Sequence, residues 1–169
     1  MKKKLIIALS CLAILFAACK KPVEPTPVDY SPNYVGNYVG QFMLTIASMN
    51  NSAVSNLTFP IDGIQMDIAK GAEINTITAT VTVDNESHQT SGTATAEKAD
   101  FGTVHLVINK PDQNYSFNLD LNLEGTKAES DTLNIVGTFT GNGNFTMPTG
   151  EAVLLNEVSG DVSGKIAKQ

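Results

Sequence analysis

The sequence contains no arginine and no tryptophan, and its 169 residues include only two histidines and two cysteines. The formal net charge is −6, and every cationic side chain is a lysine. Nucleic-acid binding needs a basic face that contacts phosphates, so an acidic chain without arginine is poorly suited to it. Two cysteines and two histidines are also too few for a structural zinc framework. The composition therefore argues against nucleic acid as a partner and against a metal-organised fold.

Hydrophobic residues make up 42% of the chain and charged residues only 17%. That proportion is enough for a packed core and argues against extensive disorder. A chain of this length provides one domain, with little room for a second.

The N-terminal segment has the layout of a secretory signal. Three lysines occupy positions 2–4, and an apolar run follows at residues 5–18. A membrane-spanning helix needs about twenty such residues, so this run is too short for a permanent span. A basic start, a short apolar stretch and small residues at its end are typical of a leader that is cleaved after export.

The end of this segment, residues 15–19, reads Leu-Phe-Ala-Ala-Cys and resembles the lipobox of bacterial lipoproteins. The resemblance implies that residues 1–18 are a cleaved signal peptide. It also implies that Cys19 is the lipid attachment site, a membrane anchor carrying palmitate-type chains on an exported cell-envelope protein. Lys20 and Lys21 follow in place of an aspartate, which favours the outer membrane and leaves open its periplasmic or surface face. An ordinary secretory signal, with Cys19 incidental, is the alternative.

Residues 19–33 are expected to form a tether between the lipidated cysteine and the folded domain. Four prolines between residues 22 and 32 exclude a helix and favour extended polyproline II. At about 3.1 Å per residue, such a segment holds the domain roughly 30–40 Å from the bilayer. A plain tether is favoured here over a specific proline-rich ligand.

From residue 34 onward the sequence predicts strands. In residues 115–123 every odd position is apolar and every even position is polar, which is the period of a strand with one buried face. Similar alternation occurs around residues 42–46, 64–68, 76–83 and 104–108. We therefore predict an all-β domain over residues 34–169, with eight to ten antiparallel strands in a single meander. Such a meander closes into a barrel or, as the alternative, splits into a β-sandwich.

Clusters of glycine, asparagine, aspartate and proline between these strands indicate turns. They predict turns at residues 49–52, 70–71, 84–85, 100–102, 109–112, 124–125 and 141–144, and a polar loop at residues 85–89.

The segment Gly36-Asn37-Tyr38-Val39-Gly40 resembles the Gly-x-Trp opening of lipocalins and other calycins, with Tyr38 in the place of the tryptophan. The whole chain is similar in layout to small envelope lipoproteins of Bacteroidetes-type bacteria with a lipocalin-like domain. The resemblance implies a closed barrel whose lumen binds a small apolar ligand. Asp131-Thr132-Leu133 resembles the O-glycosylation sequon of such proteins, which implies a glycan on Thr132.

In a small barrel, the apolar rows of the first and the most regular strand point inward together with Tyr38. The side chains expected to line the lumen are Tyr38, Phe42, Leu44, Ile46, Tyr115, Phe117, Leu119, Leu121 and Leu123. An eight-stranded barrel is either just filled by such side chains or holds one small ligand, and the sequence leaves both possibilities open.

Residues that support catalysis are sparse. The sequence has no nucleophile elbow and no phosphate-binding loop, so an enzyme, including a hydrolase, is not expected. His88 is expected in a polar loop and His105 on a strand, and a metal site would need both histidines brought together with carboxylates. We therefore predict no cofactor, no metal and no catalytic residue. The alternative function is a non-enzymatic surface or structural module with a filled core, which binds protein or glycan through its loops.

Overall fold

The computed structural model describes residues 24–50, 52–129 and 131–169. Within these residues the chain forms eight strands and two short 3-10 helices. The strands are β1 (Gly36–Met49), β2 (Ser52–Lys70), β3 (Thr76–Val83), β4 (Glu86–Ala94), β5 (Lys98–Lys110), β6 (Tyr115–Glu129), β7 (Thr132–Thr146) and β8 (Ala152–Lys168). The 3-10 helices are η1 (Ser31–Asn33) and η2 (Pro111–Gln113).

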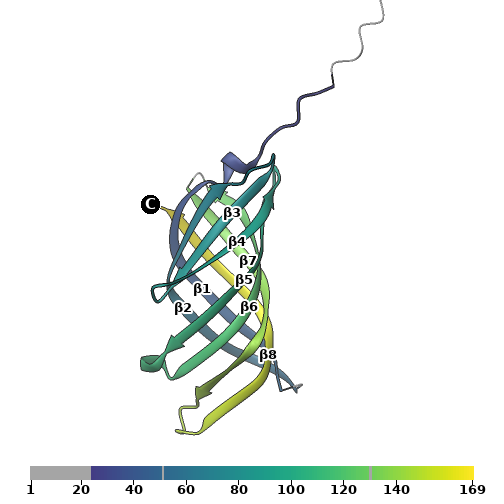
Figure 1. The fold of residues 1–169 in the computed structure, drawn as a ribbon. Coiled ribbons are helices and arrows are strands. Elements are labelled where there is room, and N and C mark those ends of the chain that lie inside the picture. Colours follow the sequence, from purple (N-terminus) through teal and green to yellow (C-terminus); the bar gives the residue numbers. More distant parts are fainter. Residues whose placement is uncertain (1–23, 51, 130) are drawn as a thin grey trace, which may run out of the picture.

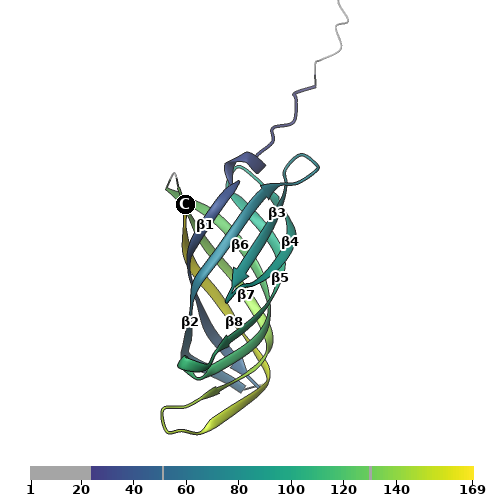
Figure 2. The ribbon, with the colours of Figure 1, turned by 60° about the vertical axis from the view of Figure 1, so that its left-hand side comes forward.

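Each strand pairs antiparallel with the next along the chain, and β8 pairs with β1 to close the ring. The result is an elongated barrel with η1 and the C-terminus at one end (Figures 1 and 2). The hairpin between β7 and β8 lies at the other end. The predicted all-β antiparallel meander is confirmed, and it forms a closed barrel rather than two separate sheets. The strand number is the lowest of the predicted range.

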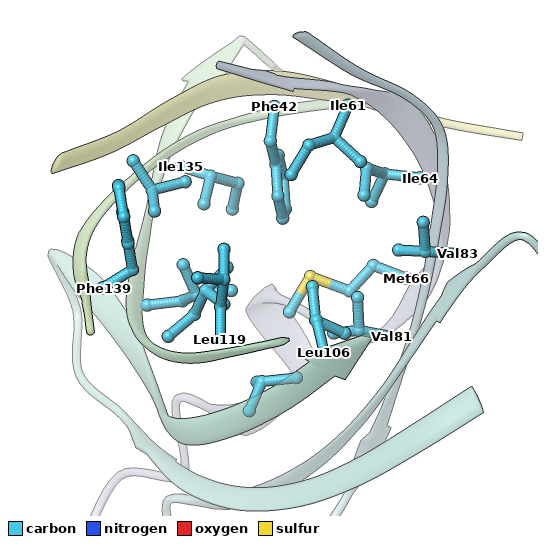
Figure 3. Close-up of a cluster of buried hydrophobic side chains, with 14 of the residues drawn as sticks. Phe42, Ile61, Ile64, Met66, Val81, Val83, Leu106, Leu119, Ile135 and Phe139 are labelled. Carbon is cyan, nitrogen blue, oxygen red and sulfur yellow. The ribbon is translucent and has the colours of Figure 1, made fainter. Parts of the chain in front are cut away.

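The period of two in the sequence sorts the side chains between the inside and the outside of the barrel. In β3, for example, Ile77, Ala79, Val81 and Val83 are buried, whereas the intervening threonines are partly exposed. Figure 3 shows side chains from β1, β2, β3, β5, β6 and β7 converging on the interior. Burial of this apolar surface is the main favourable term in folding such a barrel.

Inward-facing glycines make room for the largest of these side chains. Gly164 lies opposite Phe42, and Gly160 lies opposite Phe139. A Cβ atom built on Gly164 would come within 2.7 Å of the Phe42 ring, and one on Gly160 within 2.9 Å of the Phe139 ring. The two rings therefore occupy the space that a side chain at position 160 or 164 would need. Alternation of small and large interior residues is a common way to pack a small barrel.

The predictions of turns at residues 124–125 and 141–144 were wrong, because the glycines of these segments lie inside strands and make room for larger side chains. Gly125 belongs to β6, and Gly141 and Gly143 belong to β7. Gly143 faces Phe117 and Gly141 faces Leu119 across the ladder between β6 and β7. These glycines supply space inside the barrel instead of reversing the chain.

Two other segments that were predicted to be irregular, residues 100–102 and 86–89, belong to strands. Residues 100–102 lie inside β5, where the register to β6 shifts between Asp100 and Thr103 and Gly102 has a positive φ of 66°. A bulge of this kind bends a strand without ending it. The predicted turn at Asp84 and Asn85 is confirmed, with both residues at positive φ, but residues 86–89 of the expected polar loop belong to β4. Asn and Asp tolerate that conformation best after glycine.

The chain contacts the barrel before the first strand begins. The Asp29 carboxylate lies 2.5 Å from the Lys70 ammonium and accepts hydrogen bonds from the Ser31 hydroxyl and the Asn75 backbone N–H. Lys70 and these donors hold the pKa of Asp29 well below its usual range. These contacts involve residues from Asp29 onward, so a chain that begins at Lys20, without the predicted signal peptide and Cys19, retains them.

We expect Gly164→Ala to destabilise the domain by about 1–3 kcal/mol, because the added methyl group would lie 2.5 Å from the Gln41 carbonyl oxygen and 2.7 Å from the Phe42 ring. Chemical denaturation followed by far-UV circular dichroism measures this loss. The control is Ser163→Ala on the same strand, whose exposed side chain points outward, with an expected change within about 0.5 kcal/mol. Equal effects of the two substitutions would contradict the packing argument.

Candidate functional site: the barrel interior and its seam

All of the side chains predicted to line the lumen are buried in the barrel interior, with at most 4% of their surface exposed. Those from residues 38–46 lie on β1 and those from residues 115–123 lie on β6. The alternation also predicted the apolar faces of other strands, and Ile64, Met66, Val81 and Leu106 on those faces are fully buried. Sequence reasoning did not name Ile61 and Ile135, which are equally buried.

Tyrosines pack at the end of the barrel where the chain enters. Tyr34 follows η1 and is 1% exposed, and its backbone carbonyl accepts a hydrogen bond of 3.0 Å from the Tyr38 hydroxyl. The Tyr34 hydroxyl in turn donates to the Thr95 carbonyl at 3.2 Å. Burial raises the pKa of both phenols. Tyr34 and Tyr38 thus contribute to the packing at this end through hydrogen-bonded, neutral side chains.

A cluster of aromatic rings lies towards the opposite end. The ring centroid of Phe59, on β2, is 5.1 Å from that of Tyr115, 5.0 Å from that of Phe117 and 5.5 Å from that of Phe145. All three contacts are edge-to-face, which is a favourable geometry for aromatic pairs. Phe59 and Phe145 are each 8% exposed, more than most of the core. Phe59 is therefore the hub of this cluster and lies near its solvent boundary.

The barrel wall is uneven next to Phe59. The ladder between β2 and β3 covers only residues 65–70 of β2, and the ladder between β4 and β5 has two residue pairs. In the described part of the chain, residues 57–64 of β2 pair only with β1, and residues 103–110 of β5 pair only with β6. We call the region between these two strand segments the seam.

Side chains bridge the seam. The Tyr115 hydroxyl donates a hydrogen bond to the Pro60 carbonyl on β2. The Lys110 ammonium at the end of β5 pairs with the Asp84 carboxylate in the β3–β4 turn. A proline has no backbone N–H and is tolerated in a strand only where a ladder partner is missing, which fits Pro60. The seam is therefore held by side-chain contacts where the rest of the wall has a backbone ladder.

Two hollows lie on the outer wall. One of about 560 Å³ lies over β5, β6 and β7 and is lined by outward residues that include Asn122, Glu124, Val136 and Thr138. In this hollow the Glu124 carboxylate lies 2.6 Å from the Lys98 ammonium, which raises the pKa of Lys98. The other, of about 330 Å³, lies between β1, β7 and β8 and is lined by Ser48, Thr140, Glu157 and Ser159 among others.

The remaining predicted positions are placed as follows. Thr132 is the first residue of β7 and is partly buried. His88 was predicted to be a loop residue, but it lies on β4 opposite the buried Val81. His105 is 51% exposed on β5, as expected for an outward strand position, and its Nδ1 atom lies 2.8 Å from the Asp120 carboxylate. Cys19 and the signal peptide at residues 1–18 lie outside the described residues.

No protein-family model matches the chain, and no curated protein sequence matches it. Within residues 24–50, 52–129 and 131–169 the structure contains no helix with the length and apolar character of a membrane span.

Burial raises the pKa of Tyr115 to about 12 from its ordinary value of about 10. Between these two pH values the unfolded chain ionises at this residue while the folded chain stays neutral, so its contribution to stability is lost as pH rises from 10 to 12. At neutral pH, Tyr115→Phe is expected to cost about 1–3 kcal/mol, because the Pro60 carbonyl loses its donor. As pH rises through this range, the stability of the variant should approach that of the wild type.

Denaturation midpoints of the two proteins measured between pH 7 and pH 12.5 test this expectation. A difference in midpoint that stays constant across the alkaline range would show that Tyr115 ionises equally easily in the folded and the unfolded chain.

Proposed function

We propose that this protein is a lipid-anchored, non-enzymatic component of the bacterial cell envelope whose lipocalin-like barrel binds a small apolar molecule. The observation that carries the proposal is the combination of a predominantly apolar barrel interior with a wall that lacks a backbone ladder on one side of the β2 segment carrying Phe59. A ligand of this kind gains free energy by leaving water, at about 25 cal/mol for each Å² of apolar surface that it buries.

The two ends of the barrel support a direction for ligand entry. The tether side is packed with Tyr34 and Tyr38 and is tied down by the ion pair between Asp29 and Lys70. The opposite side has the aromatic cluster and the seam, where the β2 segment that carries Phe59 pairs with β1 on one side and has no backbone ladder on the other. The Phe59 ring packs edge-to-face against Tyr115 and Phe117 on this unpaired side. We therefore assign the entry to the seam side.

The shape and composition of the interior favour a slender, uncharged or singly charged apolar molecule such as an acyl chain. The interior is lined by aliphatic and phenyl groups, together with the phenol rings of Tyr38 and Tyr115, whose hydroxyls donate to backbone carbonyls. A bulky polar ligand would find few hydrogen-bond partners there, and burying unpaired polar groups is costly.

The second candidate is an interaction module whose core is filled by its own side chains. The observation that favours it is that both hollows described above lie on the outer wall. The larger one presents the exposed Val136 beside amide, hydroxyl and carboxylate groups, a mixture that suits a polar protein or glycan partner.

Phe59→Trp gives the chain its only tryptophan and therefore a single fluorescent reporter in the aromatic cluster. With the chain that begins at Lys20, we expect dansyl-labelled undecanoic acid to quench this tryptophan by energy transfer and to saturate at one molecule per chain. The reason is that the acyl chain binds beside residue 59.

The matched control is Ile74→Trp, which places the reporter on an exposed position beside Asn75 at the tether end of the barrel, away from the aromatic cluster. Saturable transfer to position 59 and weak transfer to position 74 would support interior binding. Equal transfer to both positions would indicate surface adsorption. No transfer to either would favour the filled interaction module.

The proposed anchor is tested on the full-length chain in a bacterium that processes lipoproteins. We expect labelled palmitate to be incorporated into the wild-type protein and Cys19→Ser to abolish the labelling, because the serine hydroxyl is not a substrate for the thiol-directed lipid transfer. The wild type should sediment with the membrane fraction and the variant should not. Cys11→Ser is the control, since Cys11 lies inside the segment that is removed. Palmitate labelling of Cys19→Ser would contradict the assignment.

A further inference from the structure

The two histidines of the chain, 17 positions apart in sequence, lie next to each other in the barrel. His88 on β4 and His105 on β5 have ring centroids 5.9 Å apart, with 73° between the ring planes. They lie where the wall is weakest, because β4 and β5 share only the pairs Thr93–Asp100 and Ala94–Ala99. Sequence reasoning required both histidines and a carboxylate to come together for a metal site, and the fold places them together.

Asp120 orients one of the two rings. Its carboxylate lies 2.8 Å from Nδ1 of His105, directly across the ladder between β5 and β6. A carboxylate accepts hydrogen bonds, so in the neutral imidazole this contact places the proton on Nδ1 and leaves the lone pair on Nε2. The same carboxylate–histidine arrangement fixes the tautomer and raises the basicity of histidines that bind metals.

The other ring has a nitrogen without a partner. Nε2 of His88 is shielded from solvent, and no hydrogen-bond partner for it is present among the described residues. Buried polar nitrogen atoms are nearly always paired, so an unpaired one in a folded protein requires an explanation. A ligand that binds this atom would supply it.

We propose that His88 and His105 bind one divalent transition-metal ion of the zinc type through their Nε2 atoms, with water molecules completing the coordination. Imidazole nitrogen suits zinc, copper and nickel, whereas calcium and magnesium take oxygen ligands. No group of three or more His, Cys, Asp or Glu side chains is placed to hold a metal in the described part of the chain. The site is therefore a two-histidine site, with Asp120 as a positioning residue.

A metal bound here links β4 to β5 at the junction with the shortest ladder. Because the ion binds the folded chain and not the unfolded one, it stabilises the barrel by an amount that grows with the logarithm of its concentration above the dissociation constant. The proposal does not depend on the binding of an apolar ligand, since the histidines and Asp120 are separate from the aromatic cluster around Phe59.

Zinc chloride titration into the chain that begins at Lys20 tests the site, with histidine imidazole ¹⁵N resonances as the readout. Only two imidazole spin systems exist in this chain, so each ring is observed separately. We expect the Nε2 resonances of both rings to shift together and to saturate at one zinc ion per chain. The melting temperature should rise over the same concentrations.

Three variants separate the roles. His88→Gln and His105→Gln should each weaken zinc binding by at least about tenfold and remove the rise in melting temperature, because each removes one ligand. Asp120→Asn should weaken binding about tenfold while both Nε2 resonances still respond, because it removes only the carboxylate that orients His105. Melting curves without metal verify that each variant is folded.

The wild-type titration stands even if a variant fails to fold. The proposal would be overturned if the two Nε2 resonances responded at different zinc concentrations. A response from only one ring, or from neither, would also overturn it. So would wild-type affinity in both folded glutamine variants.

Discussion

The pairing of large side chains with glycines across the strands is the constraint on which the barrel depends. Phe42 lies over Gly164, Phe139 over Gly160 and Phe117 over Gly143. An interior enclosed by eight strands has little width, so two large residues at facing positions of neighbouring strands would overpack it. Glycine also lets a strand coil strongly, which closing a narrow ring requires. The same glycines therefore provide both the space for the large side chains and the curvature of the strands.

The second determinant is the unequal length of the strands. β3 and β4 have 8 and 9 residues, whereas the other strands have 13 to 19. The short β3–β4 hairpin leaves β2 and β5 without a ladder partner on one side along the rest of their length, and side chains bridge that region. Both proposed sites lie beside this departure from a regular ladder, the aromatic cluster at the seam and the histidine pair where β4 and β5 separate. Function placed where regular pairing ends is a general tendency of folded proteins.

Much of the fold was predictable because a strand with one buried face imposes a period of two on the sequence. Residues 115–123 show this period without interruption, and the structure buries every apolar residue of that row. The interior positions of β1 followed in the same way. The turns were less predictable, because Gly141 and Gly143 look like turn residues when read locally and act as space inside the barrel. A glycine in the sequence is equally typical of a turn and of a space inside a barrel strand. Only the residue opposite it on the neighbouring strand distinguishes the two roles.

The sequence by itself determined the alternation of the strands, the antiparallel meander and the apolar interior, because these depend on side-chain order along one strand or on short connections. The tertiary structure decided that the sheet closes, where the seam lies, and that His88, His105 and Asp120 come together. Those features depend on register between strands that are distant in sequence. Backbone hydrogen bonds do not distinguish one side chain from another, so register is set by the packing of the whole interior. No local pattern around His88 or His105 carries that information.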